Sequence, residues 1–156
     1  MAEEMAGGCA CGAVRYRLKT PPMFVHCCHC RDCQRQTGSA FVINALIETD
    51  RITASGATPE AIPVPTESGR PHAIFRCPVC RTALWSGYGG RSALRFVRVG
   101  TLDEPALAPP DVHIYVRSKL PWVRLPDGVP AFAAYYDAKA LWPQASLERA
   151  RAIRGR

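Results

Sequence analysis

The stretch VHCCHCRDCQRQTG, residues 25–38, places four cysteines and two histidines within fourteen residues. Such a density of thiols is typical of a disulfide framework, a metal site or a reactive site. The Cys30–x–x–Cys33 spacing favours a metal, because a turn of that length points two thiolates at one ion. Cys27 and Cys28 would point to opposite sides of an extended strand, so only one of them is expected to reach the same ion. We expect the other, Cys27, to be a small buried side chain.

The whole chain favours metal binding or catalysis over disulfides. It has 156 residues, of which 47% are hydrophobic and 21% charged, and this ordinary composition predicts one globular domain, residues 1–156. No apolar run approaches the roughly 20 residues of a membrane span. The first residues, MAEEMAGGCACG, lack the long apolar segment of a secretory signal. We therefore expect a cytoplasmic protein with no membrane partner, and in a reducing compartment eight cysteines indicate metal or catalysis.

Basic residues are concentrated at the end of the chain. The net charge is +7, but residues 149–156, RARAIRGR, hold four arginines and no acid, which leaves +3 for residues 1–148. We predict that residues 145–156 form a solvated C-terminal tail. A zinc ribbon that binds nucleic acid would carry basic and exposed aromatic residues along one face. No such stripe is visible in residues 1–148, so a nucleic-acid partner is not favoured.

Short alternating runs of hydrophobic and polar residues predict a mainly-β fold with antiparallel sheets. In residues 13–18, AVRYRL, one face carries Val14, Tyr16 and Leu18, and the other carries two arginines. Further runs of this kind, or short apolar runs, occupy residues 41–47, 72–77, 93–99 and 112–118. Fourteen prolines and twelve glycines separate the runs, so the predicted strands are only a few residues long.

Few helices are expected. One covers residues 31–38 and ends at Gly38, and another covers residues 130–142 and ends before Pro143. The proline-rich residues 56–71 are predicted to form a long loop.

Two histidines near these segments could take part in chemistry. His29 could replace a cysteine as a ligand, although a surface position or a place behind the ligands is favoured. His113 lies on the polar face of its predicted strand and is expected at the surface.

The cysteines fall into three places along the chain: Cys9 and Cys11; then Cys27, Cys28, Cys30 and Cys33; then Cys77 and Cys80. The Cys9–x–Cys11 segment must bend to serve one zinc ion. Alternate residues of a strand lie roughly 6.6 Å apart, whereas two sulfurs on one zinc lie about 3.8 Å apart. Flanking glycines permit that bend.

Without Cys27, seven ligands remain, and they divide into a closed site of four and an open site of three. Spacing alone favours a zinc ribbon of Cys30, Cys33, Cys77 and Cys80, with Cys9, Cys11 and Cys28 as the trio. The other division joins Cys9, Cys11, Cys77 and Cys80, and leaves the local trio Cys28, Cys30 and Cys33. Periodicity does not decide between these two divisions.

The order of motifs resembles a known family. GGCACGAVRY, CCHCRDCQRQTGSAF, FRCPVCRTALW, VGTLDEP and HIYVRSKLPW occur in the order found in the glutathione-dependent formaldehyde-activating enzyme family, whose domain is also seen in centromere protein V. The resemblance covers residues 7 to about 132. It implies coiled antiparallel β-sheets clamped by zinc. It also implies a structural Zn²⁺ at Cys9, Cys11, Cys77 and Cys80, and a second Zn²⁺ at Cys28, Cys30 and Cys33.

One position departs from the family's pattern. Arg81 follows the second cysteine of the CPVC turn, where family members usually have glycine. A left-handed backbone at that point would be strained for arginine.

The chemistry that the resemblance implies is the making and breaking of carbon–sulfur bonds, as in a lyase. Its substrates are a small thiol, glutathione in the type enzyme, and an aldehyde such as formaldehyde. A zinc site with three cysteine ligands would favour capture of the thiol as thiolate, because a free thiol with a pKa near 8.5 is mostly protonated at neutral pH. Arg31 and Arg35 flank the trio and could meet the carboxylates of glutathione. The alternative is a zinc-binding interaction module without this activity.

Overall fold

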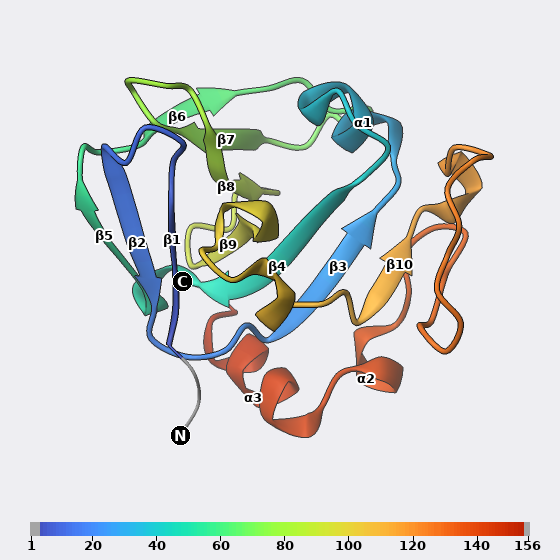
Figure 1. Ribbon diagram of the computed structural model, residues 1–156. Coiled ribbons are helices and arrows are strands. Elements are labelled where there is room, and N and C mark those ends of the chain that lie inside the picture. The colour runs from blue at the N-terminus through green and yellow to red at the C-terminus, as the bar shows by residue number, and fades with distance from the viewer. Residues whose placement is uncertain (1–3, 155–156) are drawn as a thin grey trace.

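The structure is a computed structural model that describes residues 4–154. Within these residues ten strands form two sheets, which confirms the mainly-β prediction (Figure 1). The smaller sheet has the strand order β1–β2–β5, with β1 Met5–Gly8, β2 Val14–Leu18 and β5 Ile52–Gly56. The larger has the order β10–β3–β4–β9–β8–β7–β6. Its strands are β3 Phe24–Cys28, β4 Val42–Glu48, β6 Glu60–Pro63, β7 His72–Arg76, β8 Ala83–Tyr88, β9 Leu94–Arg98 and β10 Val112–Ile114.

Strand β2 shows why alternation predicts these strands. Val14, Tyr16 and Leu18 are buried, whereas Arg15 and Arg17 are exposed, as the two-residue period requires. Every pair of neighbouring strands is antiparallel except one: β10 runs parallel to β3. The predicted antiparallel sheets are therefore confirmed. The one parallel pair lies at the edge, where a long connection from β9 returns the chain to the far side of β3.

Strand β3 separates two hydrophobic clusters, and all five of its residues are buried. Val25 belongs to the main core between the sheets, with residues from β2, β4, β8 and β9. Phe24 and Cys28 belong to a second cluster with Val112 and Ile114 of β10. Because both faces of β3 are covered, its side chains are almost entirely removed from water.

Helices are short and lie at the ends of the sheets. They are α1 Arg31–Thr37, α2 Ala138–Leu141 and α3 Gln144–Ala152, with short 3₁₀ turns at Thr49–Arg51, Val99–Thr101, Pro105–Leu107 and Val116–Ser118. Gly38 has a φ of 62° and its N–H donates to the Gln34 carbonyl at 2.8 Å, so the predicted helix stop is confirmed. Among the described residues, no helix is both long and apolar enough to cross a membrane.

The helix predicted for residues 130–142 is wrong except for its last turn, α2. The Phe132 N–H instead donates to the His113 carbonyl at 2.9 Å, and the His113 N–H donates to the Pro130 carbonyl at 2.8 Å. Residues 130–132 thus extend along the free edge of β10, and those hydrogen bonds outweigh a weak local helix propensity. The loop predicted for residues 56–71 is also interrupted, because β6 pairs there with β7.

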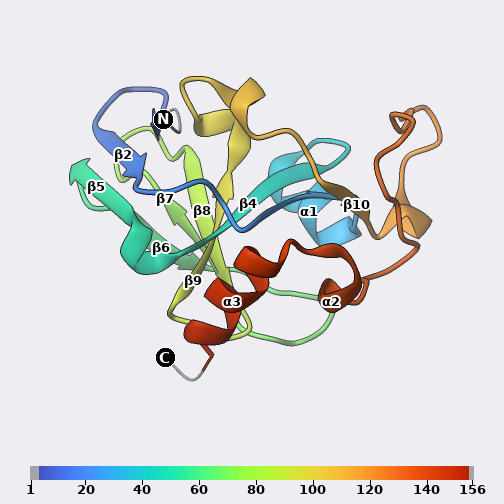
Figure 2. The ribbon, with the colours of Figure 1, turned by 90° about the horizontal axis from the view of Figure 1, so that it is seen from below.

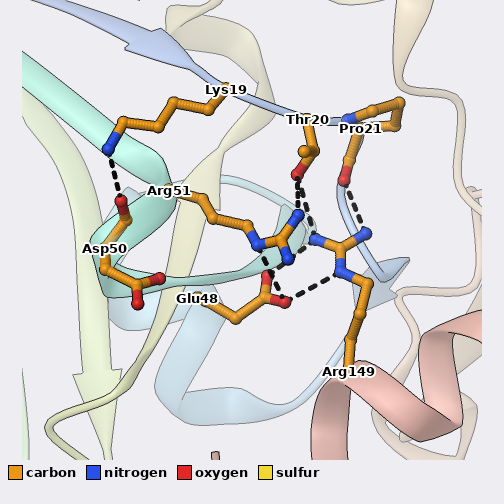
Figure 3. A network of polar contacts seen from close by, with 7 residues as sticks. All are labelled: Lys19, Thr20, Pro21, Glu48, Asp50, Arg51 and Arg149. Atoms are coloured by element: carbon orange, nitrogen blue, oxygen red, sulfur yellow. Dashed lines mark hydrogen bonds and ion pairs between the residues drawn. The ribbon is translucent and has the colours of Figure 1, made fainter. Parts of the chain in front are cut away.

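The predicted solvated tail, residues 145–156, is wrong as far as the structure describes it, to residue 154. Helix α3 lies with α2 across the lower face of the molecule in Figure 2. Arg149 donates from Nε to the buried Glu48 carboxylate at 2.8 Å and from Nη2 at 2.6 Å, and Arg51 also pairs with Glu48 (Figure 3). The Ser146 hydroxyl donates to the Met23 carbonyl at 2.6 Å. Arg149 is therefore held against the body of the protein and is not part of a solvated tail.

Candidate metal centres

Four cysteines from two distant turns converge where the small sheet meets the large one. Cys9 and Cys11 follow β1, and Cys77 and Cys80 lie in the turn between β7 and β8. The Sγ atoms of Cys9 and Cys11 are 3.6 Å apart, those of Cys11 and Cys77 are 3.9 Å apart, and all four lie within 4.8 Å of one another. These separations fit four sulfurs on one zinc, for which about 3.8 Å is expected. The geometry groups Cys77 and Cys80 with Cys9 and Cys11, not with Cys30 and Cys33.

Hydrogen bonds favour the thiolate at two members of this group, Cys9 and Cys80. The Val14 N–H donates to the Cys9 sulfur at 3.2 Å; although burial opposes ionisation, this bond lowers the pKa of Cys9. The Thr82 hydroxyl, 3.1 Å from the Cys80 sulfur, and the Thr82 N–H lower the pKa of Cys80 to about 5. Thiolates rather than thiols are the metal-binding form of cysteine.

Arg81, which follows Cys80, has the left-handed backbone that was considered for this position from the sequence. Its φ is 64°, in the left-handed region, where a non-glycine residue costs about 1–2 kcal/mol. The Arg81 N–H donates to the Cys77 carbonyl at 3.0 Å, and the Cys77 N–H donates to the Thr82 carbonyl at 3.0 Å. The Arg81 side chain pairs with Glu60 on β6. The turn keeps the geometry that glycine would supply, with arginine in its place.

A second group, Cys28, Cys30 and Cys33, lies at the junction of β3 and α1, and its sulfur atoms are within 4.8 Å of one another. Cys28 ends β3, and Cys30 is the N-cap of α1, accepting the Cys33 N–H at 3.4 Å. The thiols of Cys28 and Cys33 donate to the Cys30 sulfur and lower the pKa of Cys30 to about 2. The pKa of Cys28 rises, chiefly because its proton is bonded to Cys30. Within the group, the thiolate form is therefore favoured at Cys30.

A cavity of about 780 Å³ opens beside these three sulfurs. Its wall is strongly basic, with Arg31, Arg70, Arg91, Arg98 and Arg117 against only Asp32 and Glu67. Tyr88, Tyr115, Tyr135, His26 and His72 also line it. Arg35, by contrast, is exposed and is not among the lining residues. Such a cavity is complementary to a small anion that carries more than one negative charge.

Arg98 is the buried charge of this cavity, at 7% exposure. Burial lowers the pKa of Arg98, whereas the charge of Cys33 raises it. Its Nη1 donates to Asn44 Oδ1 at 2.5 Å, and its Nε has no partner among the described residues. The Arg98 guanidinium therefore places a positive charge and an unused N–H donor near the sulfurs of Cys28, Cys30 and Cys33.

A third group was not predicted from the sequence. Cys27, His29 and His113 place their ligand atoms within 4.8 Å of one another, and all three are buried. Cys27 is 1% exposed, as expected, but the expected surface position of His113 is wrong, because residues 130–132 cover β10. His29 is fully buried, against the ring of Phe41. The spacing of Cys27 and His29 could have shown that they share a face; their meeting with His113 depends on the parallel β3–β10 pair.

The fold and these groups define a mainly-β protein with clustered cysteines and histidines that could hold metal ions. Residues 4–118 match the model of the family described as "Glutathione-dependent formaldehyde-activating enzyme", and the chain belongs to that family. A Halomonas elongata protein named "Putative glutathione-dependent formaldehyde-activating enzyme" is 29% identical over 126 residues, covering 78% of this chain and 80% of the relative. A crystal structure of a Rhodobacter sphaeroides protein, a structural-genomics target, aligns with a TM-score of 0.48 and 19% identity, over 64% of this chain and 88% of that one.

Proposed function

We propose that the chain is a zinc-dependent enzyme of the carbon–sulfur lyase type, which joins or cleaves adducts of a small anionic thiol, such as glutathione, with an aldehyde. The observation that carries the proposal is the basic cavity that opens at Cys28, Cys30 and Cys33. Family membership and the named relative support the same chemistry. The proposed setting is the reducing cytoplasm, where cysteines do not form disulfides, and none of the eight forms one here.

The two thiol groups have different proposed roles. Cys9, Cys11, Cys77 and Cys80 would hold a closed structural Zn²⁺, and Cys28, Cys30 and Cys33 an open one. When bound at the trio, zinc would supply a position that favours thiolate over thiol. The proposed catalytic role of the trio cysteines is to provide that site next to the cavity.

The protein's own residues would bind and orient the substrate. In adduct formation the thiol gives up its proton and its sulfur bonds to the aldehyde carbon. The electron pair of the C=O bond moves to oxygen, which takes up a proton, so no net proton is gained or lost; cleavage is the reverse. Arg98 is placed to stabilise negative charge beside the sulfurs. The outer arginines, such as Arg31 and Arg70, would bind the substrate's carboxylates and so hold its sulfur toward the trio.

The test compares the natural chain with Cys30→Ser at equal zinc concentration. NMR exchange spectroscopy would follow adduct formation between glutathione and formaldehyde, and the natural chain should raise the exchange rate above the uncatalysed rate. S-methylglutathione, which has no thiol, should bind much more weakly than glutathione. Equal exchange rates for the two proteins would overturn the catalytic proposal and leave a binding module. Equal affinities for the two ligands would overturn recognition through sulfur.

A further inference from the structure

We propose that Cys27, His29 and His113 form a third metal site, distinct from the two thiol sites, which takes a soft monovalent ion, Cu(I). The Sγ of Cys27 lies 3.6 Å from Nε2 of His29, and that nitrogen lies 3.0 Å from Nδ1 of His113. From metal–ligand distances of about 2.3 Å for sulfur and 2.0–2.1 Å for nitrogen, two nitrogens on one ion are expected roughly 3.3–3.6 Å apart, and a sulfur and a nitrogen roughly 3.6–3.8 Å apart. The Cys27–His29 separation fits this range, and the two rings would move apart by a few tenths of an ångström on binding. The three atoms therefore surround a point that one ion could occupy.

The topology separates this group from the trio. Side chains alternate along β3, so Cys27 points to the face opposite Cys28. Cys27 and His113 are register partners in the parallel β3–β10 pair, and the His29 N–H continues that pairing by donating to the Ile114 carbonyl at 3.0 Å. Cys27, His29 and His113 thus meet on one side of the paired strands. An ion there would join β3 to β10 without using any sulfur of the trio.

Each imidazole has an inner nitrogen, which faces the other members of the group, and an outer nitrogen, which does not. Nδ1 of His29 and Nε2 of His113 are buried, and neither has a hydrogen-bond partner among the described residues. Only the inner nitrogens, which face each other and Cys27, are engaged. Hydrogen bonds would engage these atoms only in pairs, Cys27 with His29 and His29 with His113, whereas an ion would engage all three atoms at once.

Charge and ligand number favour Cu(I) over Zn²⁺. Within the described residues no other cysteine, histidine, aspartate or glutamate joins the group, so it offers three ligands. Zinc prefers four ligands, and with one thiolate and two neutral imidazoles it would leave a net positive charge in a nearly fully buried place. Cu(I) with the same ligands is neutral, and soft ions favour thiolate. On binding, the Cys27 thiol would release its proton to water, and no electron would be transferred.

The test adds Cu(I) without oxygen, as its bicinchoninate complex, to the full chain already loaded with zinc. We expect uptake of about one Cu(I) per chain with no release of zinc, and an X-ray absorption spectrum of one sulfur and two nitrogen neighbours. Displacement of zinc by copper would overturn the proposal, because the thiol sites would then have taken the ion. No uptake would leave a hydrogen-bonded histidine pair. Uptake of a further Zn²⁺ in preference to Cu(I) would overturn the choice of ion.

Two variants and a matched control assign the site. Cys27→Ser and His113→Gln should each weaken Cu(I) binding by about 100-fold, since removal of even an outer-shell partner costs up to that much. Their retained zinc reports that they fold. The control is His26→Gln on the same strand, where His26 is buried but contacts the Tyr136 hydroxyl at 2.6 Å; it should bind copper as the natural chain does. Unchanged copper binding by both site variants would overturn the assignment, and the spectrum of the natural chain provides a test even if one variant does not fold.

Discussion

The two thiol groups differ in what they connect. Cys11 and Cys77 are 66 residues apart, and their group joins the edge of the small sheet to the β7–β8 turn of the large one. Cys28, Cys30 and Cys33 lie within six residues at one strand–helix junction and line a cavity. A metal in the first group would close a long loop and hold the two sheets together. A metal in the second group would constrain only a short segment of the chain and would face the cavity.

The largest expected effect comes from breaking the first group. A structural zinc contributes roughly 10–16 kcal/mol of apparent folding free energy, and the net stability of a domain is about 5–15 kcal/mol. Cys77→Ser or Cys9→Ser should therefore unfold the chain, whereas Cys30→Ser should fold with less metal. Circular dichroism and zinc analysis of the purified variants measure this. If Cys30→Ser unfolds as fully as Cys77→Ser, the difference in role does not exist.

Metal removal sharpens the same comparison. Protein purified without chelator should contain between one and two zinc ions per chain, since the closed site holds its ion more tightly than the open one. A mild chelator should then remove the trio's zinc and abolish glutathione binding through sulfur, with little change in the circular dichroism spectrum. Elemental analysis along a chelator titration measures it. A folded protein with no metal, or with disulfides in reducing buffer, would contradict both metal assignments.

The ion pair of Arg149 with Glu48 tests a contact that involves neither thiol group. Glu48 has a side chain only 4% exposed. Arg149→Ala should cost roughly 2–3 kcal/mol, less than for an isolated buried pair, because Arg51 remains in contact with the carboxylate. Arg151→Ala, on an exposed position of the same helix, is the control and should be nearly neutral. Urea denaturation measures both, and equal losses would show that Glu48 does not need Arg149.

The pH dependence of this pair has a defined sign. Burial opposes ionisation of Glu48, but the hydrogen bonds from Arg149 outweigh it and lower the pKa of Glu48 below its ordinary value. The stabilisation is therefore present above the pKa of an unfolded glutamate and is lost as the pH falls through the lower pKa of the folded state. The free-energy difference between the natural chain and Arg149→Ala should shrink in acid, and a constant difference would contradict this origin.

The sequence predicts the local features of this molecule and misses those that depend on topology. Alternation in residues 13–18 identifies β2, because burial of every second side chain is a local property of a strand. The burial of His113 could not be predicted in that way, because it depends on the parallel pairing of β10 with β3 and on the cover by residues 130–132. Arg149 likewise resembles a solvated residue until α3 brings it to Glu48.

The candidate sites show the same difference: the ligand residues can be recognised locally, whereas their grouping depends on the topology. Spacing identifies the seven cysteines as ligand candidates but favours a zinc ribbon, because two CxxC turns are the obvious pair. Only the position of β1 beside the β7–β8 turn, which family resemblance anticipated, brings Cys9 and Cys11 to Cys77 and Cys80. The arginines of the cavity come from segments far apart in the chain, so no local motif reveals them.

The smallest expected effect concerns Arg81, at the turn of the four-cysteine group. Arg81→Gly removes a left-handed backbone strain of about 1–2 kcal/mol, but glycine also makes the unfolded chain more flexible, at a cost of about 0.4–1 kcal/mol. The net expectation is a stabilisation of about 0.5–1 kcal/mol. Arg81→Ala is the matched control, because it also loses the contact with Glu60 yet keeps the strained backbone. Urea denaturation of the zinc-loaded proteins should therefore rank the glycine variant above the alanine variant, and the glycine variant should lose zinc to a chelator no faster than the natural chain. If the two variants are equally stable, the strain at Arg81 is no larger than the flexibility cost of glycine, about 0.4–1 kcal/mol, and the turn does not require the family's usual glycine.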